Sequence, residues 1–141
     1  MSKSGGSAPP TINILIVDDL AQVREELADV LQLTADFNVI GTAENGRKAI
    51  ELAAQLSPDI VLMDLEMPGM DGLAAAQQII SRQLARSVII LSIHSRRRNS
   101  QRAQEVGIAA YVEKGEGIDT LITTLRQVWR KSSTMKEKVD S

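Results

Sequence analysis

The chain has 141 residues, of which 43% are hydrophobic and 24% charged, so it has the length of one ordinary domain and enough apolar residues for a packed core. Its net charge of −2 argues against a chain built to neutralise nucleic-acid phosphates or an anionic membrane. The absence of cysteine excludes disulfides, thiolate metal sites and cysteine nucleophiles, and it fits a cytoplasmic protein.

The two ends of the chain differ from its middle in composition. Residues 1–10 are rich in Ser, Gly and Pro, lack the apolar segment of a signal peptide, and are expected to form a flexible leader. Residues 131–141 are polar and charged, and are expected to form a C-terminal tail or linker. One domain is therefore predicted over residues 11–130, and the longest apolar runs in it are too short to cross a bilayer.

Within this domain, short apolar runs rich in Ile and Val alternate with stretches of helical spacing. The runs are typical of buried strands, whereas apolar residues three and four positions apart indicate helices. The expected strands are Ile12–Val17, Asn38–Ala43, Ile60–Met63, Val88–Ser92 and Ala110–Val112. Helices are expected after each of them, around residues 23–31, 49–53, 73–80, 97–106 and 118–129.

Five strands alternating with five helices predict an α/β fold with a parallel sheet covered on both faces. Right-handed crossovers leave two common doubly wound arrangements, and five strands favour the flavodoxin-like one, of order 2-1-3-4-5. In such sheets a functional site forms outside the carboxyl ends of the strands.

Polar side chains stand where four of the expected strands end. Asp18 and Asp19 follow the first strand, Asp64 the third, and Lys114 comes shortly after the fifth, while Ser92 ends the fourth. These four strands are neighbours in the order 2-1-3-4-5, so three carboxylates, a hydroxyl and an ammonium group should meet at one edge of the sheet.

Three crowded carboxylates predict a bound cation, because without one they repel each other and raise a pKa. Hard oxygen ligands suit Mg²⁺, and Mg²⁺ beside a carboxylate and a lysine is a constellation for phosphoryl transfer. Asp64 stands alone after an apolar strand, so we predict that it attacks phosphorus and becomes an aspartyl phosphate. Asp18 and Asp19 are expected to hold the metal, and one of them to cap the following helix.

These residues resemble the receiver domain of bacterial two-component response regulators, the CheY-like family, over residues 12 to about 130. The resemblance lies in Asp18-Asp19, the segment Val61–Gly72, Ser92 and the segment Tyr111–Lys114. Leu91–His94 and Tyr111–Glu116 are similar to the NarL/FixJ-type subgroup. Two departures are Gly115, where many receivers have proline, and Ile93, where a small residue is common.

The resemblance implies a role for each residue of the motif. Asp64 would accept a phosphoryl group from a sensor histidine kinase or a phosphotransfer protein. Mg²⁺ would be held by Asp18, Asp19, Asp64 and the backbone carbonyl of Glu66, and the phosphoryl oxygens would be bound by Ser92 and Lys114. Tyr111 would be the aromatic switch that turns inward when the hydroxyl of Ser92 moves, although an ordinary half-buried aromatic would also fit.

The resemblance also implies partners. The fourth helix, fifth strand and fifth helix would form the output face, through which the chain could form a homodimer. Arg96, Arg97, Arg98 and Arg102 form a basic run there, which is either a solvated helix face or part of a partner surface. Members of the subgroup usually carry a C-terminal DNA-binding domain, for which too few residues follow the last helix, so this chain is expected to be an excised receiver or a single-domain regulator without direct nucleic-acid contact.

Three other functions compete with a phosphorylation switch. A phosphatase of the haloacid-dehalogenase type also forms an aspartyl phosphate, but it needs a second Asp where this chain has Glu66. A dinucleotide-binding module needs a Gly-x-Gly-x-x-Gly loop after the first strand, where this chain has Asp18-Asp19-Leu20-Ala21. The third is a receiver-like scaffold that is never phosphorylated. On the favoured reading the chain is not a turnover enzyme, and it only catalyses its own phosphorylation and dephosphorylation.

Overall fold

A single parallel sheet organises the computed structural model, which describes residues 11–140 and side chains as far as residue 133. The leader expected at residues 1–10 lies outside the described residues. The sheet has the predicted order β2-β1-β3-β4-β5, and each neighbouring pair of strands is parallel. In chain order the elements are β1 (Ile12–Val17), α1 (Ala21–Gln32), β2 (Phe37–Ala43), α2 (Gly46–Leu56), β3 (Ile60–Asp64), α3 (Gly72–Ser81), β4 (Ser87–Ser92), α4 (Arg96–Val106), β5 (Ala110–Glu113), the 3-10 helix η1 (Lys114–Glu116) and α5 (Ile118–Asp140).

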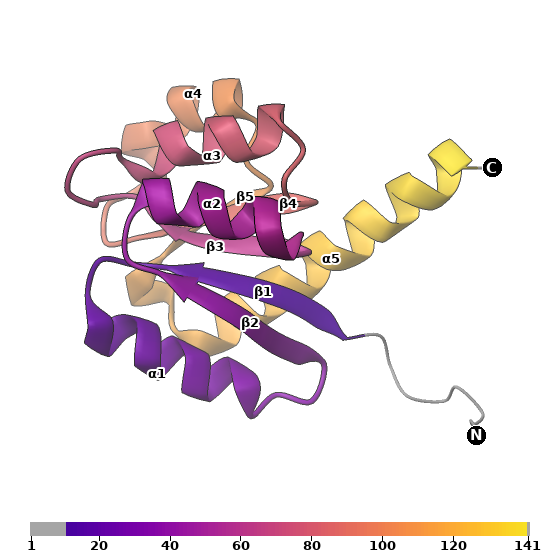
Figure 1. Ribbon diagram of the computed structural model, residues 1–141, viewed down its shortest axis with the longest axis horizontal. Coiled ribbons are helices and arrows are strands. Elements are labelled where there is room, and N and C mark those ends of the chain that lie inside the picture. Colours follow the sequence, from indigo (N-terminus) through magenta and orange to yellow (C-terminus); the bar gives the residue numbers. More distant parts are fainter. Residues whose placement is uncertain (1–10, 141) are drawn as a thin grey trace.

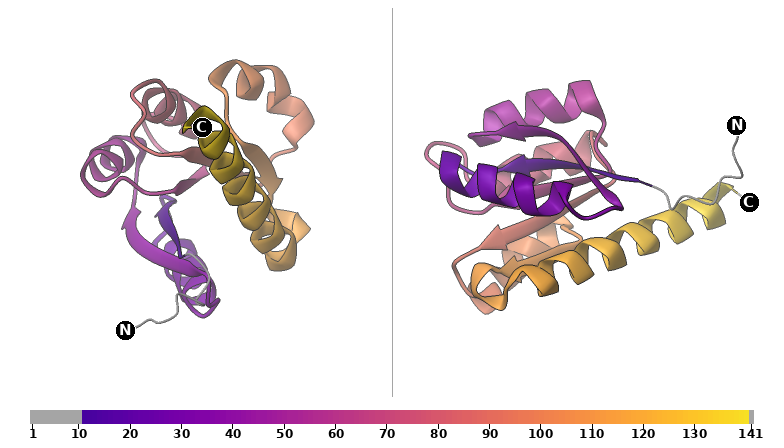
Figure 2. Two further views of the ribbon diagram at one scale, coloured as in Figure 1. Left: turned by 90° about the vertical axis from the view of Figure 1, so that its right-hand side faces the viewer. Right: turned by 90° about the horizontal axis from the view of Figure 1, so that it is seen from below.

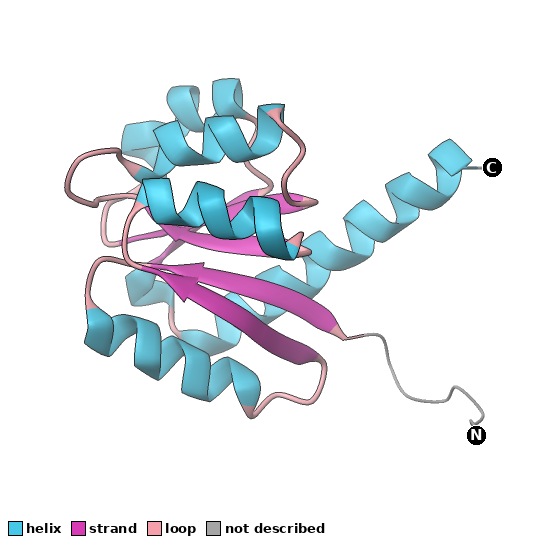
Figure 3. Ribbon diagram, in the orientation of Figure 1, coloured by secondary structure: helices cyan, strands magenta, loops and turns pink. Residues whose placement is uncertain are grey.

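Helices cover both faces of the sheet, as Figures 1 and 3 show. α1 and α5 lie on one face, and α2, α3 and α4 lie on the other (Figure 2). Each face has its own core because successive side chains of a strand point in opposite directions. In β3, for example, Val61 and Met63 pack under α2 and α3, whereas Ile60 and Leu62 pack against α1 and α5.

The central strand β3 is buried along its whole length, Asp64 included. Asp64 is the last residue of the strand and pairs with Leu91 of β4. A burial pattern of this kind forces any polar residue in β3 to its end, where the following loop can supply hydrogen bonds. The strand therefore ends on a carboxylate held close to the core.

Three helices begin with a side-chain cap, but α1 does not. Asn45 accepts a hydrogen bond from the Lys48 amide before α2, and Asp71 accepts one from the Ala74 amide before α3. Ser95 serves α4 in the same way. The prediction that Asp18 or Asp19 caps the first helix is wrong: Leu20 occupies that position and makes no side-chain cap.

The last helix is longer than predicted. α5 continues to Asp140, so residues 131–140, expected to be a tail or linker, are helical. No Gly or Pro follows residue 117, and Lys, Glu and Met favour helix, so nothing in the sequence ends α5 earlier. Figure 1 shows the C-terminal part of α5 projecting beyond the sheet. A domain boundary near residue 130 stays a prediction, and no described helix combines the length and apolarity of a membrane span.

Candidate functional site

Four strands bring polar side chains to the carboxyl edge of the sheet. Asp18 follows β1, Asp64 ends β3 and Ser92 ends β4. Lys114 follows β5 as the first residue of η1. Strand order places β1, β3, β4 and β5 side by side, so residues far apart in sequence share one small region.

Three carboxylates gather at the centre of this edge. One carboxylate oxygen from each of Asp18, Asp19 and Asp64 lies within 4.8 Å of the others. Asp18 is 1% exposed and Asp64 8%, so two of the three are buried. Asp18 is held by its own loop, because its Oδ1 accepts from the Leu20 amide at 3.0 Å and its carbonyl accepts from Arg24 Nη1 at 2.7 Å.

Lys114 supplies the positive charge in direct contact with this cluster. Its Nζ lies 3.0 Å from Asp18 Oδ2 and 3.7 Å from Asp64 Oδ1. The Lys114 side chain is 24% exposed, so its ammonium group reaches the carboxylates from the rim of the site. One ammonium against three carboxylates leaves an excess of negative charge.

Burial and the excess negative charge both affect the pKa of Asp64. The pKa of Asp64 is raised from 3.8 to about 6: burial is the largest cause and the charges of Asp18 and Asp19 add to it, whereas Lys114 and the backbone amide of Glu66 act in the opposite direction. A carboxyl group with this pKa is ionised at neutral pH yet poorly solvated. A group of this kind is a better nucleophile than a carboxylate in water, and it attracts any cation that enters.

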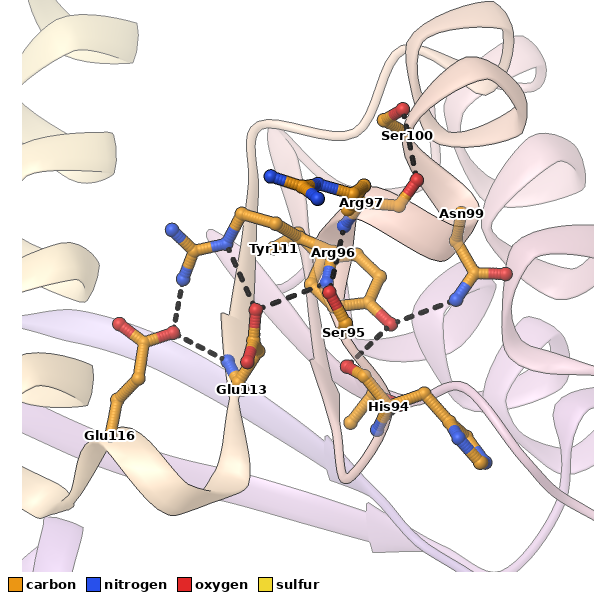
Figure 4. Close-up of polar contacts among 10 residues, drawn as sticks. His94, Ser95, Arg96, Arg97, Asn99, Ser100, Tyr111, Glu113 and Glu116 are labelled. Atoms are coloured by element: carbon orange, nitrogen blue, oxygen red, sulfur yellow. Dashed lines mark hydrogen bonds and ion pairs between the residues drawn. The ribbon is translucent and has the colours of Figure 1, made fainter.

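His94 connects two other residues singled out from the sequence. Ser92 is buried, and its Oγ accepts a hydrogen bond from the His94 amide at 3.0 Å. The hydroxyl of the half-buried Tyr111 donates to the His94 carbonyl at 3.1 Å and accepts from Asn99 Nδ2 at 3.0 Å (Figure 4). Ser92 and Tyr111 are therefore joined through the backbone of one loop residue, His94.

The sequence model of the response regulator receiver domain matches residues 14–126. The chain belongs to this family. It is thus the receiver domain of a two-component response regulator, a domain class that signals in response to phosphorylation.

Curated relatives contain this receiver domain within longer chains. The response regulator GacA of Pseudomonas aeruginosa is 33% identical over 118 residues, which cover 84% of this chain and 55% of GacA. The protein-glutamate methylesterase/protein-glutamine glutaminase 2 of Carboxydothermus hydrogenoformans is 40% identical over 111 residues, which cover 78% of this chain and 31% of that protein. This chain therefore spans about half or less of the length of these relatives.

Solved structures agree with the fold and with the predicted subgroup. The receiver domain of NarL from Mycobacterium tuberculosis superposes with a TM-score of 0.76 at 28% identity, covering 89% of this chain and 98% of that chain. A LuxR-family response regulator from Aurantimonas sp. SI85-9A1 gives a TM-score of 0.81 at 28% identity, covering 86% of each chain. The predicted family and fold are confirmed.

Receiver domains bind Mg²⁺ at a cluster of acidic residues, and the acidic cluster of this receiver suits that ion. Its ligands are carboxylate oxygens, which hard divalent cations prefer. The raised pKa of Asp64 shows that a further positive charge would be favourable there. The Glu66 side chain does not point toward the acidic cluster: it is 63% exposed, and its Oε1 lies 2.6 Å from His94 Nε2. Of Glu66, only the backbone carbonyl therefore remains as a predicted metal ligand.

The start of α3 packs closely against the backbone of Asp64. Gly72, the first residue of α3, donates its amide to the Leu65 carbonyl at 2.7 Å. A Cβ atom at Gly72 would lie 2.1 Å from the Asp64 carbonyl oxygen, so only glycine permits this approach. Asp71 caps α3 and also accepts two hydrogen bonds from Arg102 of α4.

Proposed function

We propose that Asp64 of this receiver accepts a phosphoryl group from a sensor histidine kinase or a phosphotransfer protein, and that the phosphorylated chain binds its partners differently. One observation carries the proposal: Asp64 is a buried carboxylate at the end of β3, with Asp18 and Asp19 within 4.8 Å and the Lys114 ammonium 3.7 Å away. This is the arrangement of a nucleophile between groups that neutralise phosphoryl oxygens.

The chemical step needs one oxygen of Asp64. It forms a bond to the phosphorus of the donor while the bond from phosphorus to the donor's histidine nitrogen breaks, and the electron pair leaves with that nitrogen. The product is an acyl phosphate. Because the pKa of Asp64 is about 6, its attacking form predominates by about tenfold at pH 7.

The neighbouring residues stabilise the charge that is transferred. Lys114 is placed to bind a phosphoryl oxygen by its ammonium group, and Ser92 to donate its hydroxyl to another once its bond with the His94 amide is released. Asp18, Asp19, Asp64 and the Glu66 carbonyl would hold Mg²⁺, which supplies neutralisation of phosphoryl oxygens. Water later attacks phosphorus, releases inorganic phosphate and restores the Asp64 carboxylate.

The output of the switch would pass through Ser92, His94 and Tyr111 to α4, β5 and α5. Phosphorylation adds negative charge and acceptor oxygens at Asp64, and these would attract the hydroxyl group of Ser92 and the ammonium group of Lys114. Tyr111 shares the His94 backbone with Ser92, so its hydrogen bond would change when Ser92 moves. The output face would then bind a partner protein or a second copy, without direct nucleic-acid contact by this chain.

Two finer points belong to the same proposal. The chain would act as a phosphoacceptor and not as a turnover phosphatase, because Glu66, at the position of a phosphatase's general acid, is directed to His94. We place the chain in the cytoplasm because it has no cysteine, which fits a reducing compartment.

The test is phosphorylation by acetyl phosphate in the presence of Mg²⁺, followed by intact-protein mass spectrometry. The wild type should gain a single acid-labile phosphoryl group, and Asp64→Asn should gain none. Asp29→Asn, which removes an exposed carboxylate of α1, is the matched control and should react like the wild type. An adduct that persists in Asp64→Asn, or none in the wild type, would overturn the proposal.

A further inference from the structure

The helix α4 has little apolar contact with the domain. Ala103 is its only buried residue, and Val106 adds a partly buried contact near its end. The rest of α4 is polar and includes the run of arginines. A helix with so small an apolar face depends on polar contacts for its position.

Arg96, the first residue of α4, makes the most extensive of these contacts (Figure 4). Its backbone amide donates to Glu113 Oε2 at 3.1 Å, and its Nε lies 3.5 Å from the same oxygen. Its Nη2 donates to Glu116 Oε1. One arginine thus joins α4 to the last residue of β5 and to the end of η1.

The two glutamates that Arg96 contacts also hold the turn that carries Lys114. Glu116 Oε1 accepts from the Glu113 amide at 2.9 Å, and the two residues form a reciprocal capping box around η1. Lys114 lies between them and begins this turn. The Glu113 amide and Arg96 keep the pKa of Glu116 below its usual value, so Glu116 is charged at neutral pH.

We propose that Arg96 is a positioning residue for Lys114: by holding Glu113 and Glu116, it fixes the turn that aims the Lys114 ammonium at Asp64, and it makes that aim depend on where α4 lies. The inference rests on the proposed function. The inference also assigns different roles to the arginines of the basic run. Arg96 acts within the domain through its ion pairs with Glu113 and Glu116. Arg97 is exposed and has no ion-pair partner among residues 11–133, so its side chain is accessible to other molecules.

The first test compares Arg96→Gln with its neighbour Arg97→Gln, which removes the same charge without breaking the contact. The rate of phosphorylation by acetyl phosphate with Mg²⁺ is measured well below the unfolding temperature. The three side chains are each 32–53% exposed, so the contact is worth a modest amount and Arg96→Gln should react about three- to fivefold more slowly. Arg97→Gln should match the wild type.

A second variant separates positioning from loss of folding. Glu116→Gln keeps an oxygen for the Glu113 amide but loses the charge that Arg96 binds, so it should slow phosphorylation to a similar extent. The double variant should be no slower than either single one, because the same contact is already lost. The side-chain NMR resonance of Lys114 should shift in both single variants and stay in place in Arg97→Gln, a change that lower stability alone would not produce.

The outcomes are distinct. Equal phosphorylation rates for Arg96→Gln and Arg97→Gln, or additive effects of Arg96→Gln and Glu116→Gln, would overturn the positioning role while leaving the phosphoacceptor intact. A wild type that takes up no phosphoryl group would overturn the proposed function itself.

Discussion

Removing the charge of Asp64 should stabilise the metal-free protein, although it removes the proposed phosphoacceptor. In Asp64→Asn the side chain keeps its size and loses the charge that burial, Asp18 and Asp19 all disfavour. A rise in the pKa from 3.8 to about 6 corresponds to about 3 kcal/mol of lost stability, at about 1.36 kcal/mol for each unit. Water at the rim of the site screens part of the repulsion, so we expect a gain of about 2 kcal/mol at pH 7.5.

The gain should depend on pH in a defined way. Below pH 3.8 both the folded and the unfolded wild type keep the Asp64 proton, so the carboxyl group costs nothing. Between pH 3.8 and about 6 only the folded state keeps it, and the stability of the wild type falls relative to the variant as pH rises. Above pH 6 the difference is complete.

Urea denaturation at pH 7.5 and pH 3.5 in the presence of a chelator measures this difference. Asp64→Asn should unfold at a higher urea concentration than the wild type at pH 7.5, and the two should converge at pH 3.5. Asp29→Asn controls for the loss of one exposed negative charge and should follow the wild type. Equal or lower stability of Asp64→Asn at pH 7.5 would refute the account in which crowded carboxylates raise the pKa of Asp64.

Three further outcomes follow from the same site. Millimolar Mg²⁺ should raise the melting temperature of the wild type more than that of Asp64→Asn, because the ion binds the folded state through that carboxylate; equal shifts in a thermal melt would contradict this. Gly72→Ala should cost about 2 kcal/mol or more in urea denaturation, because its Cβ would meet the Asp64 carbonyl, whereas Gly115→Ala has no neighbour within 4 Å and should be close to neutral. Lys114→Gln should raise the pKa of Asp64 above about 6 in a carbon NMR titration, because Lys114 lowers it in the wild type; an unchanged pKa would show that the ammonium does not reach the carboxylate.

The sequence was enough to predict the sheet and the residues at its edge. Apolar runs in β3 and β4 have the length and composition of buried strands, and the alternation with helices restricts the order of a parallel sheet to very few choices. In a parallel sheet of that order, the carboxyl ends of all strands lie at the same edge. The polar residues that follow or end four of these strands must therefore lie at one edge: Asp18, Asp64, Ser92 and Lys114. Backbone topology alone therefore implies the acidic cluster.

Features that depend on side-chain conformation across loops were beyond the reach of the sequence. Arg96 and Arg102 were predicted as part of one basic run, yet Arg96 binds Glu113 and Glu116 whereas Arg102 binds Asp71. Their pattern in the helix is that of any solvated face, and only the packing of α4 beside β5 and α3 decides which acids they meet. The connection of Ser92 to Tyr111 through His94 could not be predicted from the sequence either, because it consists of hydrogen bonds to backbone groups that every residue possesses.

The amino-acid sequence by itself determined the strand order, the family and the set of polar residues at the carboxyl edge. Hydrophobic periodicity depends on residues a few positions apart, and the order of elements follows the chain, so both can be derived from residue types alone. The tertiary structure alone decided how far the pKa of Asp64 rises, the absence of a cap on α1 and the contacts that hold α4. These depend on burial, on the distances between charges and on the balance of weak local preferences, which take their values only after the chain has folded.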